Sequence, residues 1–268
     1  MPLHLSPSFR ERLAGSDRAL IGMWACSGSP LLAEIAAGSG LDWLLIDMEH
    51  SANTLESTLL QLQVVAAYPI TPVVRVPSND TVAIKQVLDL GAQNLIVPMV
   101  SSAEEARAAV SATRYPPEGV RGVGSALARS ARWNRVDGYL RDSARHTSVT
   151  VQIETTAGVD AAAEIAAVEG VDAVFVGPSD LSASMGLLGQ QTHPEVVSAV
   201  ERVFAAVTAA GKPVGVNAFD PSAADAYVTA GADFVAVGAD VALLARASEA
   251  LAARFIPASR ADAARASY

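Results

Sequence analysis

Eight short apolar runs recur along the chain, and a stretch with helical spacing separates each run from the next. The runs cover residues 19–25, 43–47, 71–76, 94–100, 148–154, 172–178, 213–219 and 233–239. Their apolar residues are continuous rather than alternating, which is typical of parallel strands that are covered on both faces. Parallel strands need crossover connections that are usually helical, so the sequence predicts an α/β protein.

Local signals mark where the intervening helices begin and end. Pro30 follows Ser29, and Pro221 follows Asp220, so each proline occupies a first helical turn behind a capping residue. Phrases such as SGLDW and AGADF precede several runs, and their glycines suit the ends of helices. After the eighth run we expect one amphipathic helix, ALLARASEALAARF, and a frayed end, SRADAARASY.

Eight strand and helix units in 268 residues predict a TIM barrel, that is, a (β/α)8 barrel in a single domain over residues 1–268. The alternative is a doubly wound sheet, which usually has fewer strands. It would also favour a glycine-rich fingerprint after the first strand, and the segment WACSGSP does not have that pattern.

Composition narrows the possible partners. The net charge is -9 without a basic stripe, which argues against nucleic acid and against anionic membrane surfaces. Cys26 is the one cysteine, so no intramolecular disulfide forms, and a small buried thiol is its expected state. The first residues do not have the pattern of a signal peptide, and no apolar run approaches the roughly 18 residues of a spanning helix. We therefore expect a cytoplasmic protein.

Polar residues gather at the carboxyl ends of the predicted strands, where a TIM barrel keeps its active site. They are Asp47, Glu49 and His50 after the second run, Arg75 in the third, Gln152 and Glu154 in the fifth, Asp180 after the sixth, and Asn217 in the seventh. Because these residues come from different strands, the barrel would bring them to one mouth.

The carboxylates of Glu154 and Asp180 have no lysine beside them in the sequence. Two hard oxygen ligands, completed by water and an oxygen-rich substrate, suit Mg²⁺ or Mn²⁺, although an ion-pair network with Arg75 would use the same residues. A guanidinium that points inward from an apolar strand needs an anion. That anion is either a carboxylate of the chain, as in a structural salt bridge, or a ligand's carboxylate or enolate.

His50 stands near Asp47 and Glu49, so a carboxylate could orient its imidazole as a general base. A lone histidine is otherwise a surface residue or a satisfied core residue. Lys85 and Lys212 are the only lysines, and neither falls at the catalytic end of a predicted strand. A Schiff-base mechanism therefore has no lysine, and carbonyl chemistry would need a metal instead.

The segments WLLIDMEHSANT, TPVVRVPSND, VQIETTAG and VGPSDLSASMG, in this order, resemble those of the HpcH/HpaI aldolases. These are class II, metal-dependent pyruvate aldolases of the 4-hydroxy-2-oxoheptanedioate aldolase type. The resemblance runs over about residues 5–256. It implies a phosphoenolpyruvate/pyruvate-domain-like barrel and a homohexamer, a dimer of trimers, whose C-terminal helix packs on a neighbouring subunit.

The same resemblance implies a role for each polar residue. Glu154 and Asp180 would hold a divalent ion, which is Mg²⁺, Mn²⁺ or Co²⁺, and Arg75 would contact the keto oxygen of pyruvate. His50 would work with a water as the base, with Asp47 nearby as its orienting carboxylate. An aspartate at the position of Asp89 would come from a neighbouring subunit and assist the histidine.

Further residues would bind the substrates. Gln152 would lie beside the metal and the substrate, and the backbone around Gly177, Pro178 and Ser179 would border the pyruvate carboxylate. Pro178 has no N–H group, so Ser179 is the expected donor. Asn217 stands where other members carry an aliphatic residue facing the aldehyde, which suggests a polar acceptor such as a hydroxyaldehyde.

The expected reaction is the addition of pyruvate, or of a related 2-oxoacid such as hydroxypyruvate, to an aldehyde, and the reverse cleavage of 4-hydroxy-2-oxoacids. Two alternatives from the same superfamily are a lyase for citramalyl or malyl thioesters and an oxaloacetate decarboxylase. The thioester lyase would need a basic surface for coenzyme A, which this acidic chain does not show. A non-catalytic metabolite-binding barrel is the alternative from a different class, and it would be expected to lose the metal carboxylates or the histidine.

Overall fold

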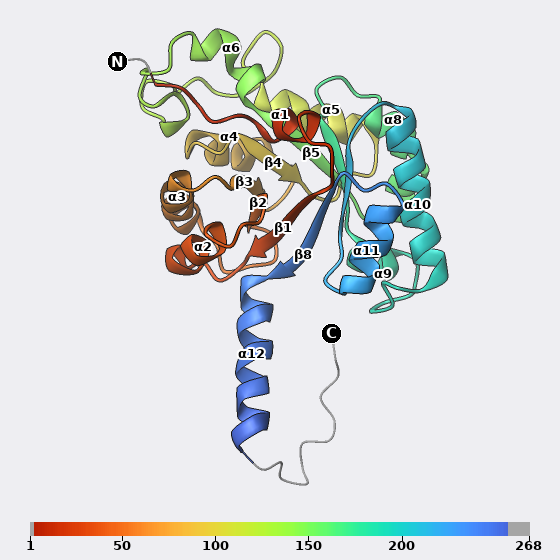
Figure 1. Ribbon diagram of the computed structural model, residues 1–268. Coiled ribbons are helices and arrows are strands. Elements are labelled where there is room, and N and C mark those ends of the chain that lie inside the picture. Colours follow the sequence, from red (N-terminus) through yellow and green to blue (C-terminus); the bar gives the residue numbers. More distant parts are fainter. Residues whose placement is uncertain (1–2, 257–268) are drawn as a thin grey trace.

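Eight parallel strands close into a barrel in the computed structural model, which describes residues 3–256 (Figure 1). The strands are β1 Leu20–Ala25, β2 Trp43–Asp47, β3 Thr71–Arg75, β4 Asn94–Val97, β5 Ser148–Ile153, β6 Ala173–Val176, β7 Val214–Asn217 and β8 Phe234–Ala239. Each strand pairs with the next in the sequence, and β8 pairs with β1 to close the barrel. Every run predicted as a strand contains one of them, so the predicted TIM barrel is confirmed.

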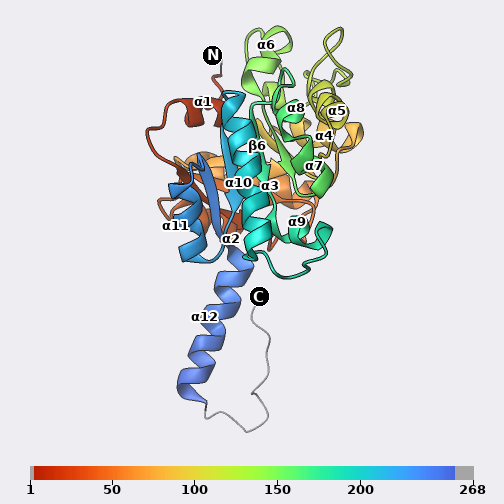
Figure 2. The same cartoon turned by 90° about the vertical axis from the view of Figure 1, so that its right-hand side faces the viewer.

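Helices surround the barrel on its outside (Figure 2). The α-helices are α1 Phe9–Ala14, α2 Pro30–Ala37, α3 Leu55–Val64, α4 Thr81–Asp89, α5 Ala103–Thr113, α6 Tyr139–His146, α7 Thr156–Asp160, α8 Ala162–Ala166, α9 Pro178–Ser184, α10 Pro194–Ala209, α11 Pro221–Thr229 and α12 Asp240–Phe255. Two 3₁₀ helices are η1 Val65–Ala67 and η2 Arg129–Ala131. The predicted caps are present, because Ser29 accepts from the amide of Leu32 and Asp220 accepts from the amide of Ala223.

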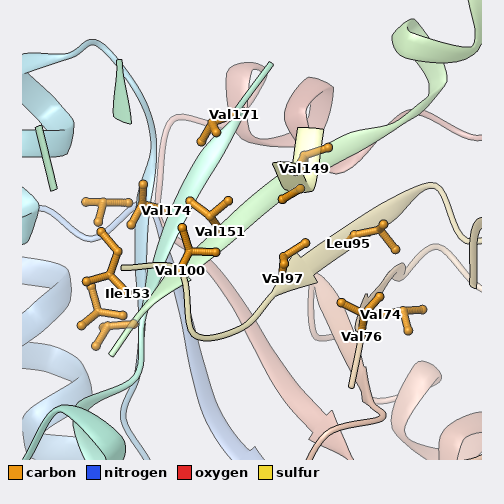
Figure 3. Close-up of a cluster of buried hydrophobic side chains, with 14 of the residues drawn as sticks. Val74, Val76, Leu95, Val97, Val100, Val149, Val151, Ile153, Val171 and Val174 are labelled. Carbon is orange, nitrogen blue, oxygen red and sulfur yellow. The ribbon is translucent and has the colours of Figure 1, made fainter. Parts of the chain in front are cut away.

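The strands bury both faces, as their continuous apolar runs predict. Val74 and Val97 point outward to the helices and belong to a valine-rich layer that Figure 3 shows in part. Val73 and Ile96, one residue away on the same strands, point into the barrel. The alternation of side chains along a strand therefore feeds two separate cores.

Aromatic rings fill the inside of the barrel. The rings of Trp43 and Phe234 lie 5.7 Å apart, and Phe9 of α1 meets Phe234 edge-on at 5.2 Å. These large rings require small neighbours, because a Cβ atom built on Gly22 would overlap the ring of Trp43, and one on Gly215 would overlap Phe234.

The two ends of the barrel differ. Helix α12 leaves at the carboxyl ends of the strands and projects away from the barrel, whereas α6 lies at the opposite end (Figure 1). Several apolar side chains of α12 are exposed, among them Leu243, Leu251 and Phe255. The predicted frayed end SRADAARASY lies outside the described residues. No helix within residues 3–256 is long and apolar enough to cross a membrane.

Substitution of Gly22 by alanine tests the packing of the aromatic interior. The added methyl group meets the Trp43 ring, so we expect Gly22→Ala to lower the free energy of unfolding by about 1–3 kcal/mol. Gly238→Ala on β8 is the matched control, since the nearest atom to its added methyl group lies 4.0 Å away. Urea unfolding of both variants checks the prediction, and equal stability of the two would contradict it.

Candidate active site

The carboxyl ends of β2 and β3 carry a buried ion pair. Asp47 and Arg75 face each other in the register of the two strands. Nε and Nη2 of Arg75 donate to the two carboxylate oxygens of Asp47 at 2.8 and 2.9 Å. Nη1 lies 2.9 Å from Oε2 of Glu49. The sequence predicted that a buried Arg75 needs an anion, and the carboxylates of Asp47 and Glu49 are the anions that the structure places beside it.

Trp24, at the end of β1, completes the surroundings of this arginine. The guanidinium carbon of Arg75 lies 4.3 Å from the centre of the Trp24 ring, which is a cation–π contact. The indole Nε1 of Trp24 donates to Oδ1 of Asn217 at 2.8 Å. Asn217 thus fixes the ring that the guanidinium contacts. Trp24 was not among the site residues predicted from the sequence.

Burial and charge act against each other in this cluster. Burial disfavours the charge of Arg75, but Asp47 and then Glu49 outweigh it, so the pKa of Arg75 lies above its usual value. Burial is also the main reason that the pKa of Glu49 is raised, and the charge of Arg75 offsets part of that effect. Asp47 and Glu49 therefore keep Arg75 charged and fixed in position at the barrel mouth.

Glu154 follows β5 and is almost fully buried, with 1% of its surface exposed. Its Oε1 accepts the backbone N–H of Met99 at 2.8 Å, and its Oε2 accepts from Nε2 of Gln152. Burial raises the pKa of Glu154 to about 7, and the charges of Glu49 and Asp180 add to this effect, whereas the two hydrogen bonds oppose it. Gln152 therefore lies directly beside Glu154, the predicted metal ligand.

Gly177, at the end of β6, lies directly against these groups. A Cβ atom at this position would lie 2.6 Å from Oε2 of Glu154 and 2.9 Å from Nε2 of Gln152. Any larger residue would press on the carboxylate. Asp180 sits one turn further along, exposed in the first turn of α9. Glycine at position 177 therefore allows the end of β6 to pack closely against the carboxylate of Glu154.

The charges at this mouth favour a bound cation. Four carboxylates, those of Asp47, Glu49, Glu154 and Asp180, influence one another there, against the single cation of Arg75. Buried negative charge without compensation is costly. Within residues 3–256 no three His, Cys, Asp or Glu side chains form a complete metal-ligand set. Mg²⁺ is commonly bound by only one or two carboxylates of the protein, while water and substrate occupy its other coordination positions.

His50 lies at the edge of the mouth with its side chain 66% exposed. The structure differs here from the expected orientation of its imidazole by Asp47. The carboxylate of Asp47 instead accepts the backbone N–H groups of Glu49 and His50, at 3.0 and 3.2 Å. The imidazole Nε2 lies 3.9 Å from Oε1 of Glu49. Asp47 therefore positions His50 through the backbone of the turn, because its oxygens are already bound to Arg75.

Asp89 lies away from this group. It ends α4, which runs back from the mouth to the amino-terminal end of the barrel, and its Oδ1 accepts from Nη2 of the fully buried Arg121 at 2.9 Å. Within one chain the structure does not bring Asp89 to His50.

The start of α9 carries the residues expected to border a carboxylate. Gly177 precedes the helix and gives it no side-chain cap, so the amides of the first turn keep no partner within the helix. The hydroxyl of Ser179 donates to Oε1 of Gln191 at 2.9 Å. Pro178 occupies the first helical position.

Two further residues shape the site without a clear signal in the sequence. Met99 has a left-handed backbone, with φ of 57°, and so presents its N–H group to Glu154. Asp240, at the start of α12, accepts the amides of Cys26 and Ser27 at 2.8 and 3.1 Å. Cys26 was predicted to be a buried thiol, and the structure leaves it half-buried. Burial is the main reason that the pKa of this thiol is raised to about 12.

The raised pKa of Glu154 predicts a pH dependence of stability. The folded state binds this proton more tightly than the unfolded state, so the contribution of Glu154 favours folding below its ordinary pKa of 4.5. That contribution is lost as the pH rises toward about 7. The side chain of Glu154→Gln stays neutral at every pH. The free energy of unfolding of this variant, relative to that of the wild type, should therefore increase as the pH rises from 4.5 to about 7. Denaturant unfolding in EDTA between these pH values measures the difference, and parallel curves would contradict the assignment.

Comparison with known proteins identifies the family. The sequence model described as HpcH/HpaI aldolase/citrate lyase matches residues 20–247. The chain is 54% identical over 259 residues to the hydroxypyruvate/pyruvate aldolase of Deinococcus radiodurans, covering 97% of this chain and 93% of that protein. It is 52% identical over 248 residues to the 4-hydroxy-2-oxo-heptane-1,7-dioate aldolase of Salmonella dublin, covering 92% of this chain and 94% of that one.

A solved structure agrees with these relatives. A HpcH/HpaI aldolase/citrate lyase family protein from Burkholderia cenocepacia J2315 superimposes with a TM-score of 0.87 at 42% identity, over 90% of this chain and 96% of that chain. The chain therefore belongs to the HpcH/HpaI aldolase/citrate lyase family.

Proposed function

We propose that this protein is a metal-dependent aldolase that joins pyruvate, or a related 2-oxoacid such as hydroxypyruvate, to an aldehyde, and that it cleaves 4-hydroxy-2-oxoacids in reverse. The aldolase class follows from the family and from the relatives named above. The observation that carries the proposal is the fixed guanidinium of Arg75 at a mouth whose remaining charge is negative. An enolate oxygen needs such a cation.

Glu154 and Asp180 are the residues that would hold the divalent ion, which is Mg²⁺, Mn²⁺ or Co²⁺. Their support is the excess of carboxylates over cations and the lack of a side chain at Gly177, where a Cβ atom would collide with the Glu154 carboxylate. When bound, the ion would supply Lewis-acid polarisation of a keto oxygen. Gln152, bonded to Glu154, would border both the ion and the substrate.

Arg75 would donate to the keto oxygen of pyruvate as negative charge develops on it. Asp47, Glu49 and Trp24 hold the guanidinium before substrate arrives, so little reorganisation accompanies the reaction. A donor of this kind contributes about 3 kcal/mol of transition-state stabilisation.

The substrate carboxylate would bind at the start of α9, around Gly177, Pro178 and Ser179. The first-turn amides have no partner within the helix, and a helix N-terminus favours an anion. Pro178 has no N–H group, so Ser179 would be the donor.

His50 would act through a water as the base that removes a proton from the substrate methyl group. Its exposure at the mouth leaves the imidazole open to water, and Asp47 fixes its backbone. Asp89 of a neighbouring subunit would assist it, since α4 carries the residue of the same chain to the other end of the barrel. Asn217 already binds Trp24 through Oδ1, so only its amide Nδ2 would remain for a hydroxyl group of the aldehyde.

Assembly and location belong to the same proposal. The exposed leucines and Phe255 of α12 would pack on a neighbouring subunit in a homohexamer built as a dimer of trimers. We also propose one domain over residues 1–268, of which the structure describes 3–256, and a cytoplasmic location that suits the single cysteine.

Metal removal tests the proposed function. After EDTA treatment we expect aldol addition of pyruvate to a panel of aldehydes to fall to background, because two carboxylates alone cannot polarise a keto group. Added Mg²⁺, Mn²⁺ or Co²⁺ should restore it. Product formation followed by mass spectrometry measures the effect. Activity that survives complete metal removal, or a pyruvate adduct trapped by borohydride, would overturn the proposal.

Substitution of the proposed base is a second test. His50→Ala should lower kcat by about 100-fold or more, the usual contribution of a general base. His4→Ala is the control, because His4 is exposed and lies outside the barrel mouth. Steady-state kinetics of both variants with metal present check the prediction. Full turnover in His50→Ala would remove His50 from the mechanism and leave the aldolase class standing.

A further inference from the structure

A pocket opens at the amino-terminal end of the barrel, away from the mouth just described. Its volume is about 270 Å³, and the first residues of β3 and β4, Thr71 and Asn94, are part of its wall. Thr71 begins β3 and Arg75 ends it, so a strand of roughly 13 Å separates the pocket from the proposed catalytic arginine. The pocket is not a subsite of the proposed reaction.

Among residues 3–256, three arginines line this pocket and no carboxylate does. They are Arg12 of α1 and Arg129 and Arg132 in and beside η2. Within residues 3–256 none of the three forms an ion pair. Such a cluster is unexpected in a chain whose net charge is -9. Arginines on an acidic protein normally find carboxylates, so these three are available to an anion from outside.

Some of their donors have structural partners. Arg129 donates to the carbonyls of Leu90 and Leu62 at 3.0 and 3.3 Å, and thereby ties η2 to the barrel. Arg132 donates through Nη1 to the carbonyl of Arg129 at 2.6 Å. The other donors of Arg132 and all those of Arg12 bind no other group in the part of the chain that the structure describes. These two residues therefore keep free N–H groups at the pocket.

Asp42 is an acidic group whose charge interacts with that of Arg12, and it is already bound to another arginine. Asp42 accepts from both terminal nitrogens of Arg18, at 2.7 and 2.8 Å. Arg18 is the main reason that the pKa of Asp42 is lowered, and Arg12 makes a smaller contribution. The carboxylate of Asp42 is thus bound to Arg18, and Asp42 does not line the pocket.

Arg129 and Arg132 also lie close together and are half-buried. A Cβ atom on Gly91 would lie 2.8 Å from Nη1 of one and 3.0 Å from Nη1 of the other, so both guanidiniums flank the same glycine. Burial, followed by the charge of Arg132, lowers the pKa of Arg129 to about 10. Two like charges held together out of water are unfavourable, and a bound anion would offset that cost.

Apolar residues form another part of the wall, beside the polar side chains of Thr71 and Asn94. The apolar part of the pocket wall includes Val65, Tyr68, Ile70 and Pro72. We propose that this pocket binds a small organic anion, whose carboxylate or phosphate group meets Arg12 and Arg132 and whose short carbon skeleton lies against this wall. The planar fork of donors on arginine matches both kinds of oxyanion.

Binding of two probes tests the proposal and separates the two oxyanions. Inorganic phosphate and succinate are titrated separately into the wild-type protein at constant ionic strength, with sodium chloride as the reference. Isothermal titration calorimetry and the shift in Tm report binding. We expect saturable stabilisation by at least one probe beyond that of chloride, and the stronger probe identifies the preferred oxyanion.

Variants locate the binding. The double variant Arg12→Gln and Arg132→Gln should weaken the affinity by at least about 10-fold, the loss expected for charged hydrogen bonds. Arg12→Gln alone is the second variant, since Arg12 is exposed and its loss should leave folding intact. Arg135→Gln, on the same connection but outside the pocket, should bind like the wild type. Absence of any stabilisation beyond chloride, or equal affinity in all variants, would overturn the proposal.

Discussion

The ion pair between Asp47 and Arg75 is the interaction on which the site depends. Barrel closure places the two residues opposite each other on adjacent strands, so their bidentate geometry follows from strand register. Removing one partner would leave a buried charge without compensation, which costs about 3–5 kcal/mol. The same carboxylate also accepts the amides of Glu49 and His50. One side chain thus joins a strand end, a fixed cation and the turn that carries the proposed base.

The barrel separates two regions of opposite charge. At the carboxyl ends of the strands, Glu49, Glu154 and Asp180 leave negative charge that Arg75 does not balance, which suits a divalent ion and the oxyanions that it would bind. At the amino-terminal end, arginines line a pocket to which no carboxylate of residues 3–256 contributes. The aromatic interior, with Trp43 and Phe234 at its centre, lies between them and excludes water from the strand layer.

The sequence predicts the strands well because each parallel strand buries both faces, and a continuous apolar run is a direct consequence of that burial. The caps at Ser29 and Asp220 are equally local and were predicted correctly. The residues at the barrel mouth follow from the same reasoning, since the carboxyl ends of all eight strands meet there.

The partners of those residues could not be predicted in the same way. His50 is close to Asp47 in sequence, which suggests contact between their side chains, but Arg75 on the next strand and the backbone of the turn occupy that carboxylate. Trp24 and Asn217 are 193 positions apart, and only barrel closure brings them together. The backbone N–H of Met99 reaches Glu154 because of a left-handed residue that carries no glycine signal.

The most direct test of the central claim, that Arg75 stabilises an enolate, is exchange of the methyl protons of pyruvate with deuterium oxide. NMR spectroscopy follows this half-reaction without an aldehyde and with a divalent ion present. The account predicts that the wild-type protein catalyses exchange and that Arg75→Lys slows it by about 100-fold or more, as for a lost oxyanion donor. Equal exchange rates in the folded variant and the wild type would contradict it.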